Sequence, residues 1–373
     1  MLKVRRVGRE TRPIARAGGI VNNTKRMTPP PSFSQVFAEL SAERAMSPLV
    51  ARRVFDSILA GGWTPVQIGA LLVSLELLGQ TSGVIVAAAK AMRAKMVEVK
   101  HELPLVFDTC GTGGDGMNSV NVSTGAAIIV AAAGVPVAKH GNRSASSRTG
   151  TADVLVALGV PIDVPPSAAA DVLRAANIAF LFAPEHHPAM KYAAAPRREL
   201  GVPTIFNILG PLCNPALATH QLVGTFSEEL RPVMAAALAS LGVKGAWVVR
   251  GEDGLDEISP FGPTRVSVLL AGKVEEGVVT PEDFGLTRSP PGAIDGGDAK
   301  RNAGILLEVL SGQAHPSRTA LLLNAAACLA IAKDLRLKDA AELAQKMLDT
   351  GRARETLERW RVAARAKSPG GAT

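Results

Sequence analysis

The sequence predicts an α/β protein in two parts: a small all-helical N-terminal domain and a larger α/β domain whose mostly parallel sheet is flanked by helices. Apolar residues recur at helical spacing from Phe33 to about Met96. After His101, short β-like runs alternate with alanine-rich helical stretches, which is typical of a parallel sheet. With 373 residues and 47% hydrophobic composition, the chain can bury a large core.

The helical domain is predicted over residues 33–98. Its apolar side chains repeat three or four positions apart, as at Val36 and Leu40, and the pattern indicates about four helices. Thr64 and Pro65 are expected to begin one of them, because threonine suits the N-cap and proline suits the first helical position.

The α/β domain is predicted over residues 99–362. Strands are expected at 105–107, 135–138, 178–182, 222–226, 246–249 and 266–270. Helices are expected at 126–133, 152–158 and 319–333, and the Pro/Gly-rich stretch 289–297 is expected to be a surface loop.

The positive charge of the chain is concentrated in residues 1–32. This segment holds eight basic side chains and one acidic one, a net +7 of the formal +8. We expect it to be a disordered tail, with Met27 as an alternative start, and residues 363–373 to form a second tail. Since the rest of the chain is nearly neutral, nucleic acid is not an expected partner.

The cysteines and the hydropathy favour a cytoplasmic protein. Cys110, Cys213 and Cys328 are widely spaced and odd in number, which argues against a disulfide framework and against a zinc site. No apolar run approaches the roughly 20 residues of a membrane span, and no secretory signal is recognisable. We therefore expect no membrane association.

A glycine-rich loop follows the first predicted strand. GTGGDG at 111–116 places four glycines in six residues, so that backbone N–H groups can turn toward one ligand. Ser123 and Thr124 are expected to cap the next helix, whose N-terminus favours an anion. The spacing matches neither GxGxxG nor GxxxxGK[ST], which argues against dehydrogenases and P-loop NTPases. The loop predicts a phosphate-bearing ligand.

Two further polar clusters extend this prediction. KHGNRSASS at 139–147 combines Lys and Arg with several hydroxyls, which suits phosphate oxygens, although a structural loop is an alternative. GEDGLDE at 251–257 follows the predicted strand 246–249, at the sheet edge where parallel sheets bind ligands. Its carboxylates suit Mg²⁺, and a solvated acidic turn is the alternative.

With NVST at 121–124 and HPAMKYAAAPRRELGVPTIFNILGPLCNPA from His187, these motifs resemble the anthranilate phosphoribosyltransferases of tryptophan biosynthesis, from about Phe33 to Trp360. The resemblance implies transfer of the phosphoribosyl group from 5-phosphoribosyl 1-diphosphate (PRPP) to the amino group of anthranilate, with Mg²⁺ as cofactor. It also implies a homodimer formed through the helical domain, and packing of part of residues 188–211 back onto the helices.

The resemblance implies roles for individual residues as well. The PRPP site would comprise Gly111, Gly114, Asp115, Ser119, Asn121, Val122, Ser123, Thr124, Lys139, His140, Gly141, Asn142, Arg143, Ser144, Ala145, Ser146, Ser147 and Thr151. The Mg²⁺ ligands would be Ser123, Asp256 and Glu257, and the anthranilate contacts Gly111, Asn142 and Arg197. Catalysis would be electrostatic and positional, with no dedicated catalytic residue. His140 either lines the acceptor pocket or is held by polar groups of its loop.

Four positions depart from the pattern of the family: Val156, Arg250, Cys213 and Pro196, of which Pro196 directly precedes Arg197. Acceptor binding is therefore the part of the resemblance that these departures affect most.

Two alternatives remain at this point. A pyrimidine nucleoside phosphorylase-like enzyme would bind inorganic phosphate, whereas the pairs Asn142–Arg143 and Asp256–Glu257 favour a Mg²⁺-bound diphosphate. A non-enzymatic relative that binds nucleic acid would need basic residues on its folded body, whereas here they concentrate toward the two ends of the chain.

Overall fold

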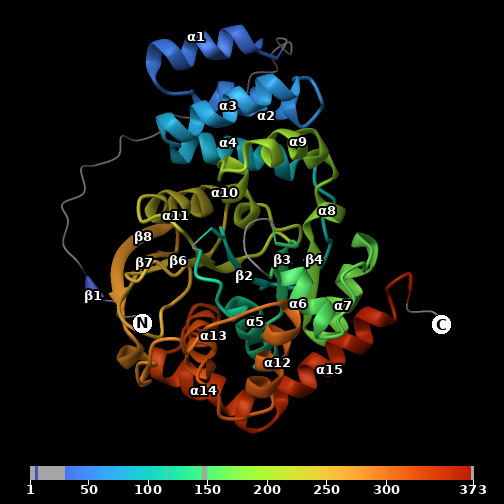
Figure 1. Ribbon diagram of the computed structural model, residues 1–373, viewed down its shortest axis with the longest axis vertical. Coiled ribbons are helices and arrows are strands. Elements are labelled where there is room, and N and C mark those ends of the chain that lie inside the picture. Colours follow the sequence, from blue (N-terminus) through green and yellow to red (C-terminus); the bar gives the residue numbers. More distant parts are fainter. Residues whose placement is uncertain (1–4, 7–29, 115, 145–148, 371–373) are drawn as a thin grey trace.

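The computed structural model describes residues 5–6, 30–114, 116–144 and 149–370 (Figure 1). Four helices form a cap above a larger α/β domain: α1 (Phe33–Glu43), α2 (Pro48–Ile58), α3 (Pro65–Leu78) and α4 (Ser82–Arg93). This arrangement confirms the predicted combination of a small helical part and a larger α/β part. Most of the predicted basic tail, including Met27, lies outside the described residues.

Local capping explains where the N-terminal helices begin. The Thr64 side chain accepts a hydrogen bond from Gln67 N, the Gln67 side chain accepts one from Thr64 N, and Pro65 is the first helical residue. The predicted start of α3 is therefore confirmed. Ser47 caps α2 in the same manner, by accepting from Val50 N.

A later segment of the chain completes the core of the helical domain. Helix α9 (Lys191–Leu200) packs on α3, and α10 (Ile205–Leu212) packs on α4. Phe206 of α10 meets Phe55 of α2 edge to face, with ring centroids 5.9 Å apart. Residues from both parts of the sequence thus share one apolar cluster.

The α/β domain contains one sheet of eight strands in the order β1-β8-β7-β6-β5-β2-β3-β4. The strands are β1 (Arg5–Arg6), β2 (Phe107–Gly111), β3 (Val137–Gly141), β4 (Ile178–Phe182), β5 (His220–Gly224), β6 (Gly245–Gly251), β7 (Thr264–Leu270) and β8 (Lys273–Val279). Strands β2 to β6 pair in parallel, and β7, β8 and β1 extend the sheet in antiparallel fashion. The prediction of a mostly parallel sheet is confirmed.

Several strand positions differ from those predicted. Strands β2 and β3 lie two or more residues further along the chain, because the sheet buries the polar residues Asp108, Thr109 and Lys139 that apolar patterning left out. Strand β8 was not predicted, because its sequence KVEEGVV lacks a continuous apolar run. It is the second strand of an edge hairpin with β7, where charged side chains can remain exposed.

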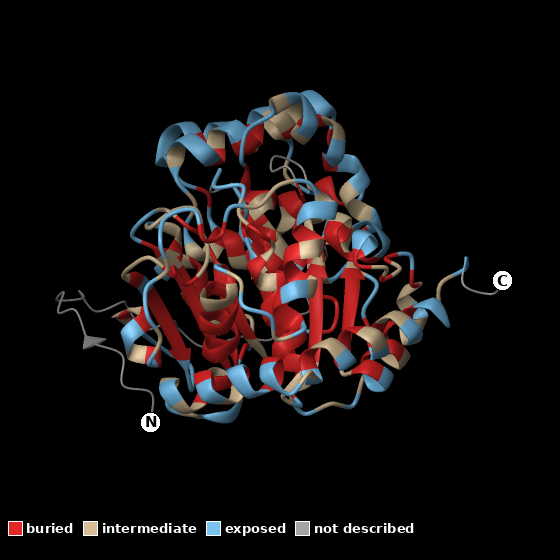
Figure 2. Cartoon of the chain, turned by 60° about the horizontal axis from the view of Figure 1, so that its bottom comes forward, coloured by how far each residue is buried: buried red, intermediate tan, exposed pale blue. Residues whose placement is uncertain are grey.

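Helices cover both faces of the sheet. They are α5 (Val122–Ala132), α6 (Thr151–Ala157), α7 (Ala169–Ala176), α8 (Ala183–His186), α11 (Leu230–Ser240), α12 (Ala299–Leu310), α13 (Arg318–Lys333), α14 (Leu337–Asp349) and α15 (Arg352–Arg365), with short 3₁₀ turns at Pro166–Ala168, Pro188–Met190 and Pro281–Phe284. Figure 2 shows the strands and inner helices buried and the outer helix faces exposed. Helix α13 is buried along most of its length, as predicted. Among the helices described, none has both the length and the apolar character that crossing a membrane requires.

Candidate active site

The glycine-rich loop begins where β2 ends. Gly113, Gly114 and Gly116 have φ angles of +64°, +90° and +71°, in the left-handed region that glycine adopts without strain. At Gly111 a Cβ would lie 2.7 Å from Asp256 Oδ2, so a larger residue would displace that carboxylate. The loop therefore brings its backbone against the acidic cluster. Asp115, between these glycines, lies outside the described residues.

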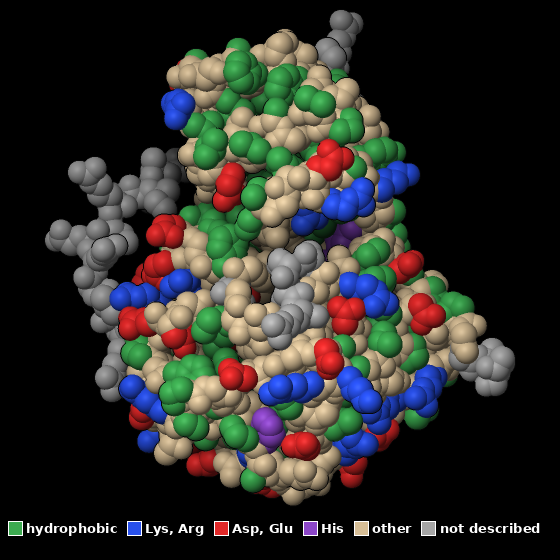
Figure 3. Space-filling model, in the orientation of Figure 1, with side chains coloured by type: hydrophobic (Ala, Val, Ile, Leu, Met, Phe, Trp, Pro, Cys, Tyr) green, Lys and Arg blue, Asp and Glu red, His purple; other side chains and the backbone are tan. Residues whose placement is uncertain are grey.

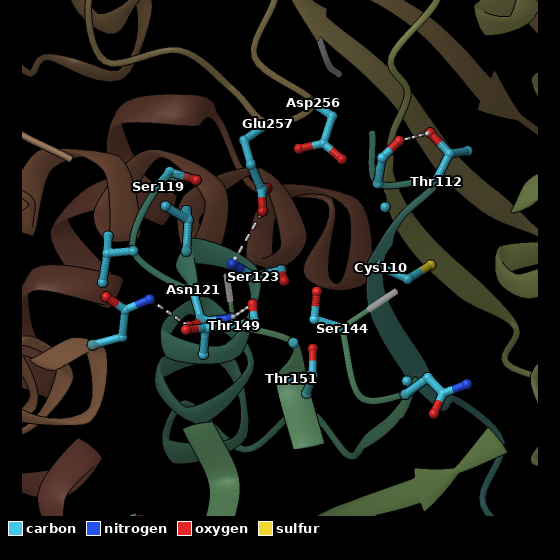
Figure 4. A pocket seen from close by; sticks show the side chains of 18 of the residues that line it. Cys110, Thr112, Ser119, Asn121, Ser123, Ser144, Thr149, Thr151, Asp256 and Glu257 are labelled. Carbon is cyan, nitrogen blue, oxygen red and sulfur yellow. Dashed lines mark hydrogen bonds between the residues drawn. The ribbon is translucent and has the colours of Figure 1, made fainter. Parts of the chain in front are cut away.

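Helix α5 follows the loop, but its first turn differs from the prediction. Asn121 is the N-cap residue, and Ser123 and Thr124 lie within the first turn, so the prediction that they cap the helix was wrong. The first helical residue is Val122, one position before Ser123. One first-turn amide meets a carboxylate: Ser123 N donates to Glu257 Oε1 over 3.1 Å (Figure 4).

Lys139 forms part of the floor of the site. Its side chain is buried, and its Nζ donates to Thr109 O at 2.6 Å and to Ser123 Oγ at 3.2 Å. Burial lowers the pKa of Lys139, while nearby Asp108 acts in the opposite direction. Burial likewise raises the pKa of Asp108 to about 6 against the opposing effect of Lys139. The two buried charges thus partly compensate each other beneath the loop.

The segment after β3 is held in place by Asp153. This carboxylate accepts hydrogen bonds from the amides of Ser144 and Gly150 and forms a 2.8 Å ion pair with Arg143. Burial alone would raise the pKa of Asp153, but these hydrogen bonds lower it. Gly150 must be glycine, since a Cβ would lie 2.3 Å from Ser144 N. The predicted site residues Ala145, Ser146 and Ser147 lie outside the described part of the chain.

Asp256 and Glu257 lie just beyond the carboxyl end of β6, as the sequence predicts. Gly224, at the end of β5, lets the Asp256 backbone approach, since a Cβ there would lie 1.5 Å from Asp256 O. Figure 4 shows the side chains of Asp256, Glu257 and Ser123 around the same space. Two carboxylates and a hydroxyl are hard oxygen ligands that fit Mg²⁺, which commonly takes its remaining ligands from substrate phosphates and water. Accordingly, the described residues contain no cluster of three or more His, Cys, Asp and Glu side chains that would hold a metal alone.

These elements surround a polar pocket of about 310 Å³. The predicted PRPP and Mg²⁺ residues that line it are Gly111, Gly114, Ser119, Asn121, Val122, Ser123, Lys139, His140, Gly141, Asn142, Arg143, Ser144, Thr151, Asp256 and Glu257. Thr124 does not line it, because its side chain is buried inside the first turn of α5. The lining also includes Gly297 and Asn302, which the sequence analysis missed because no local motif surrounds them.

A second pocket of about 500 Å³ adjoins the first and lies between the α/β domain and the segment that carries α8 to α10. Its wall is largely apolar, with contributions from Met92, Pro184 and Pro211. Arg197 of α9 also lines it, with its guanidinium carbon 5.5 Å from the centroid of the Phe206 ring. Burial lowers the pKa of Arg197. Within the described ranges no carboxylate pairs with this guanidinium.

Pro196 does not remove Arg197 from this pocket. It is buried inside α9, and the helix continues to Leu200 although Pro196 has no backbone N–H to donate. The other three departures lie away from both pockets: Val156 is exposed on α6, Cys213 is buried, and Arg250 donates to Phe226 O.

Two histidines meet at the boundary between the pockets. His140 Nδ1 lies 3.1 Å from Gly210 O, and His140 Nε2 lies 3.2 Å from His187 Nε2. Burial, reinforced by neighbouring histidines, holds the pKa of His140 well below its ordinary value and lowers that of His187 to about 4. Both rings are therefore neutral near neutral pH. His140 lines both pockets, and its ring is held by Gly210 and His187, which belong to other segments, and not by polar groups of its own loop.

The pockets share one wall. Gly111 and Asn142 line both of them, together with Cys110, His140, Gly141, Arg143 and Asn207. Asn207 was not predicted as a site residue. Its side-chain oxygen accepts from Thr204 N at 3.0 Å and so caps α10. Ligands in the two pockets would meet at this shared wall.

Comparison with known proteins agrees with this geometry. The chain belongs to the glycosyl transferase family: the helical bundle domain of this family matches residues 35–96, and its a/b domain matches residues 103–354. An anthranilate phosphoribosyltransferase from Parvibaculum lavamentivorans is 45% identical over 337 residues, which cover 90% of this chain and 98% of the relative.

Two solved structures extend the comparison. The anthranilate phosphoribosyltransferase of Thermus thermophilus is 40% identical with a TM-score of 0.83, covering 88% of this chain and 99% of its own. The enzyme of Saccharomyces cerevisiae in complex with PRPP and Mg is 29% identical with a TM-score of 0.83, covering 90% and 98%. The chain therefore belongs to the anthranilate phosphoribosyltransferase family, and the two alternatives considered from the sequence are set aside.

Proposed function

We propose that the polar pocket binds PRPP with Mg²⁺, that the second pocket binds anthranilate, and that the phosphoribosyl group passes to the anthranilate amine, giving N-(5-phosphoribosyl)anthranilate and diphosphate. The shared wall carries this assignment. Because Gly111 and Asn142 line both pockets, the ribose carbon and the attacking amine would meet beside them.

Anion binding in the first pocket rests on backbone amides and buried charge. The amides of the glycine-rich loop and of the first turn of α5 supply donors, and Lys139 supplies a positive charge close to Ser123. These groups are fixed before the reaction, so they stabilise the charge that develops on the departing diphosphate without reorganising. The Asp153 hydrogen bonds fix Ser144 and Arg143 in the same way.

Ser123, Asp256 and Glu257 would hold Mg²⁺. The proposal is supported by the oxygen chemistry of the three side chains, by their position in the pocket and by the PRPP and Mg complex of the yeast relative. When bound, the ion supplies positive charge that neutralises the diphosphate leaving group. The Ser123 amide holds Glu257 at the pocket through its 3.1 Å hydrogen bond.

The acceptor side of the reaction needs orientation more than activation. Arg197 would bind the carboxylate of anthranilate, and the ortho amine would then point toward the shared wall. The amine is neutral and nucleophilic, and the adjacent imidazoles of His140 and His187 are neutral as well, so these two side chains add no positive charge beside the cationic ribose. The chain needs no covalent intermediate and no dedicated catalytic base.

Assembly as a homodimer through the helical domain is supported by its exposed apolar side chains. Val66, Val73 and Leu77 are 82%, 38% and 80% exposed and lie on one face of α3. Figure 3 shows hydrophobic side chains gathered over this part of the surface. Light scattering after gel filtration should give twice the chain mass, and Leu77→Glu should give a monomer. Val156→Glu, on the α/β domain, is the control and should leave the dimer intact. A cytoplasmic location remains a prediction from the sequence.

Loss of anthranilate fluorescence tests the activity directly. Purified protein with PRPP and Mg²⁺ should consume anthranilate, and omission of PRPP or chelation of Mg²⁺ should stop the reaction. If no fluorescence is lost at any enzyme concentration, the assignment is refuted. Consumption of a pyrimidine nucleoside with inorganic phosphate in the same preparation would instead indicate phosphorylase chemistry.

A further inference from the structure

A closed ring of four hydrogen bonds lies in the wall of the polar pocket. Asn302 Nδ2 donates to Asn121 Oδ1 at 3.0 Å, and Asn121 Nδ2 donates to Thr149 O at 3.4 Å. Thr149 Oγ1 donates to Gly297 O at 2.8 Å, and Gly297 N donates to Asn302 Oδ1 at 2.8 Å. Figure 4 shows Asn121 and Thr149 side by side at this wall. The ring joins the start of α5, the start of α6 and the segment that leads into α12.

The ring has only one consistent orientation. Gly297 N can only donate, so the oxygen of the Asn302 amide must face it, and the Asn302 NH₂ group must face Asn121. Thr149 O can only accept, so the NH₂ group of Asn121 must face it, and Asn121 Oδ1 remains for Asn302. Asn302 is 1% exposed, and both of its side-chain polar atoms are engaged in this ring.

The segment before Asn302 also pairs with residues 118–120, which connect the glycine-rich loop to α5. Val120 N donates to Ile294 O at 2.8 Å, and Gly296 N donates to Asn118 O at 3.1 Å. A Cβ at Gly296 would lie 2.7 Å from Asn118 O, so the contact requires glycine. Residues 289–297 form the loop before α12 that the sequence predicts, with Asp295 exposed and Ala293 and Ile294 buried. The hydrogen bonds of its second half support the connection from the glycine-rich loop to α5.

We propose that Asn302 is a positioning residue for PRPP. It holds Asn121 and Thr149, and thus the two halves of the anion-binding pocket, at a fixed spacing before the substrate binds. Asn302 lines the pocket and holds its two neighbours, through one hydrogen bond to Asn121 Oδ1 and one from Gly297 N. The inference rests on the proposed assignment of the first pocket to PRPP.

Steady-state kinetics of Asn302→Ala and Asn302→Asp provide the test. Asn302→Ala removes both hydrogen bonds of this side chain. Since the loss of one buried hydrogen bond corresponds to about a tenfold effect, we expect it to raise the KM for PRPP at least about tenfold and to leave the KM for anthranilate within about twofold. Asn302→Asp keeps the acceptor for Gly297 N but faces Asn121 Oδ1 with a second oxygen. It should raise the KM for PRPP at least as much as Asn302→Ala does.

A second asparagine supplies the matched control. Asn177 also donates one hydrogen bond to the backbone, to Ala131 O at 2.8 Å, but it lies at the far end of the sheet and lines neither pocket. Asn177→Ala should lower the melting temperature and leave both KM values unchanged. On an Asn121→Ala background, Asn302→Ala should have little further effect on the KM for PRPP, because the shared contact is already lost.

The outcomes separate the role of Asn302 from the function itself. If Asn302→Ala lowers the melting temperature but leaves the KM for PRPP unchanged, as Asn177→Ala does, Asn302 only stabilises the fold and the proposal is overturned. If Asn302→Ala does not fold, Asn302→Ser is measured against the same criterion. An inactive wild type would instead refute the PRPP assignment before any variant is compared.

Discussion

Removal of the Arg197 guanidinium should weaken the use of anthranilate far more than the binding of PRPP. This guanidinium lines the second pocket, where no carboxylate of the described residues pairs with it. Burial lowers its pKa, because the group is partly desolvated. It is therefore available for an anionic ligand. A hydrogen bond to a charged group contributes about 1.5–3 kcal/mol. Arg197→Ala should therefore reduce kcat/KM for anthranilate by about 10- to 150-fold.

The assay follows anthranilate fluorescence while each substrate is varied in turn. Arg197 lines only the second pocket, so the KM for PRPP should change by less than about twofold. Arg198→Ala is the matched control, since Arg198 is exposed on the same helix and lines neither pocket. Arg197→Lys should recover only part of the activity, because an ammonium group cannot bind a carboxylate in bidentate fashion.

Equal effects on both substrates would show that this reasoning is wrong. Arg197→Ala also removes a contact with the Phe206 ring, worth about 0.5–1 kcal/mol at a partly exposed site. A small loss of stability is therefore expected in addition to the kinetic effect. If the KM for PRPP rises in parallel with that for anthranilate, the guanidinium supports the shape of the whole site and does not bind the acceptor.

Three further outcomes follow from the site. Gly111→Ala should lower kcat/KM for both substrates in the same assay, because Gly111 lines both pockets and the new Cβ would lie 2.7 Å from Asp256 Oδ2. A change in kcat/KM for one substrate only would contradict this prediction. Glu257→Gln should raise the Mg²⁺ concentration for half-maximal activity by about 10- to 100-fold, while Glu252→Gln, an exposed residue of the same turn, should not. The pKa of His187 is lowered to about 4 from 6.5, so its neutral form stabilises the fold fully above about pH 6.5, and this contribution is lost as the pH falls toward 4. In urea unfolding, the free energy of unfolding of His187→Gln should therefore fall by about 3 kcal/mol less than that of the wild type over that range. The pKa of Asp108 is raised to about 6, so Asp108 changes the stability in the opposite direction, but equally in both proteins, and its effect cancels in the comparison. Parallel pH profiles of the two proteins would disprove the assignment.

Most of the polar pocket could be predicted, because the sequence features that indicate it are local. Consecutive glycines with positive φ, a helix N-terminus and a neighbouring Lys produce a recognisable run of sequence. Anion binding by backbone amides needs no particular side chain. In the sequence it is indicated only by the glycines that leave space for the ligand. The acidic pair Asp256 and Glu257 was predictable for a related reason, since it follows directly after a parallel strand.

Contacts between distant segments could not be predicted in this way. Asn302 and Asn121 are 181 positions apart, and neither residue alone differs from an ordinary helix N-terminal asparagine. The positions of β2 and β3 were displaced for a similar reason. Asp108 and Lys139 are polar, so an apolar pattern ends before them, yet the fold buries both: Asp108 accepts from His140 N, and Lys139 Nζ donates to Thr109 O.

Helix α10 connects the two parts of the molecule, and its Asn207 lines both pockets. At its C-terminal end, Gly210 O faces His140 Nδ1 of β3, and Pro211 O accepts from Gln221 Nε2 of β5 at 2.8 Å. Its next carbonyl, Leu212 O, accepts from Arg93 Nε at the end of α4 over 2.8 Å. The end of α10 is thus tied both to the sheet and to the helical domain, whereas Arg197 is carried by α9, outside these ties. Since α9 packs on α3, Arg197 is positioned through the helical domain.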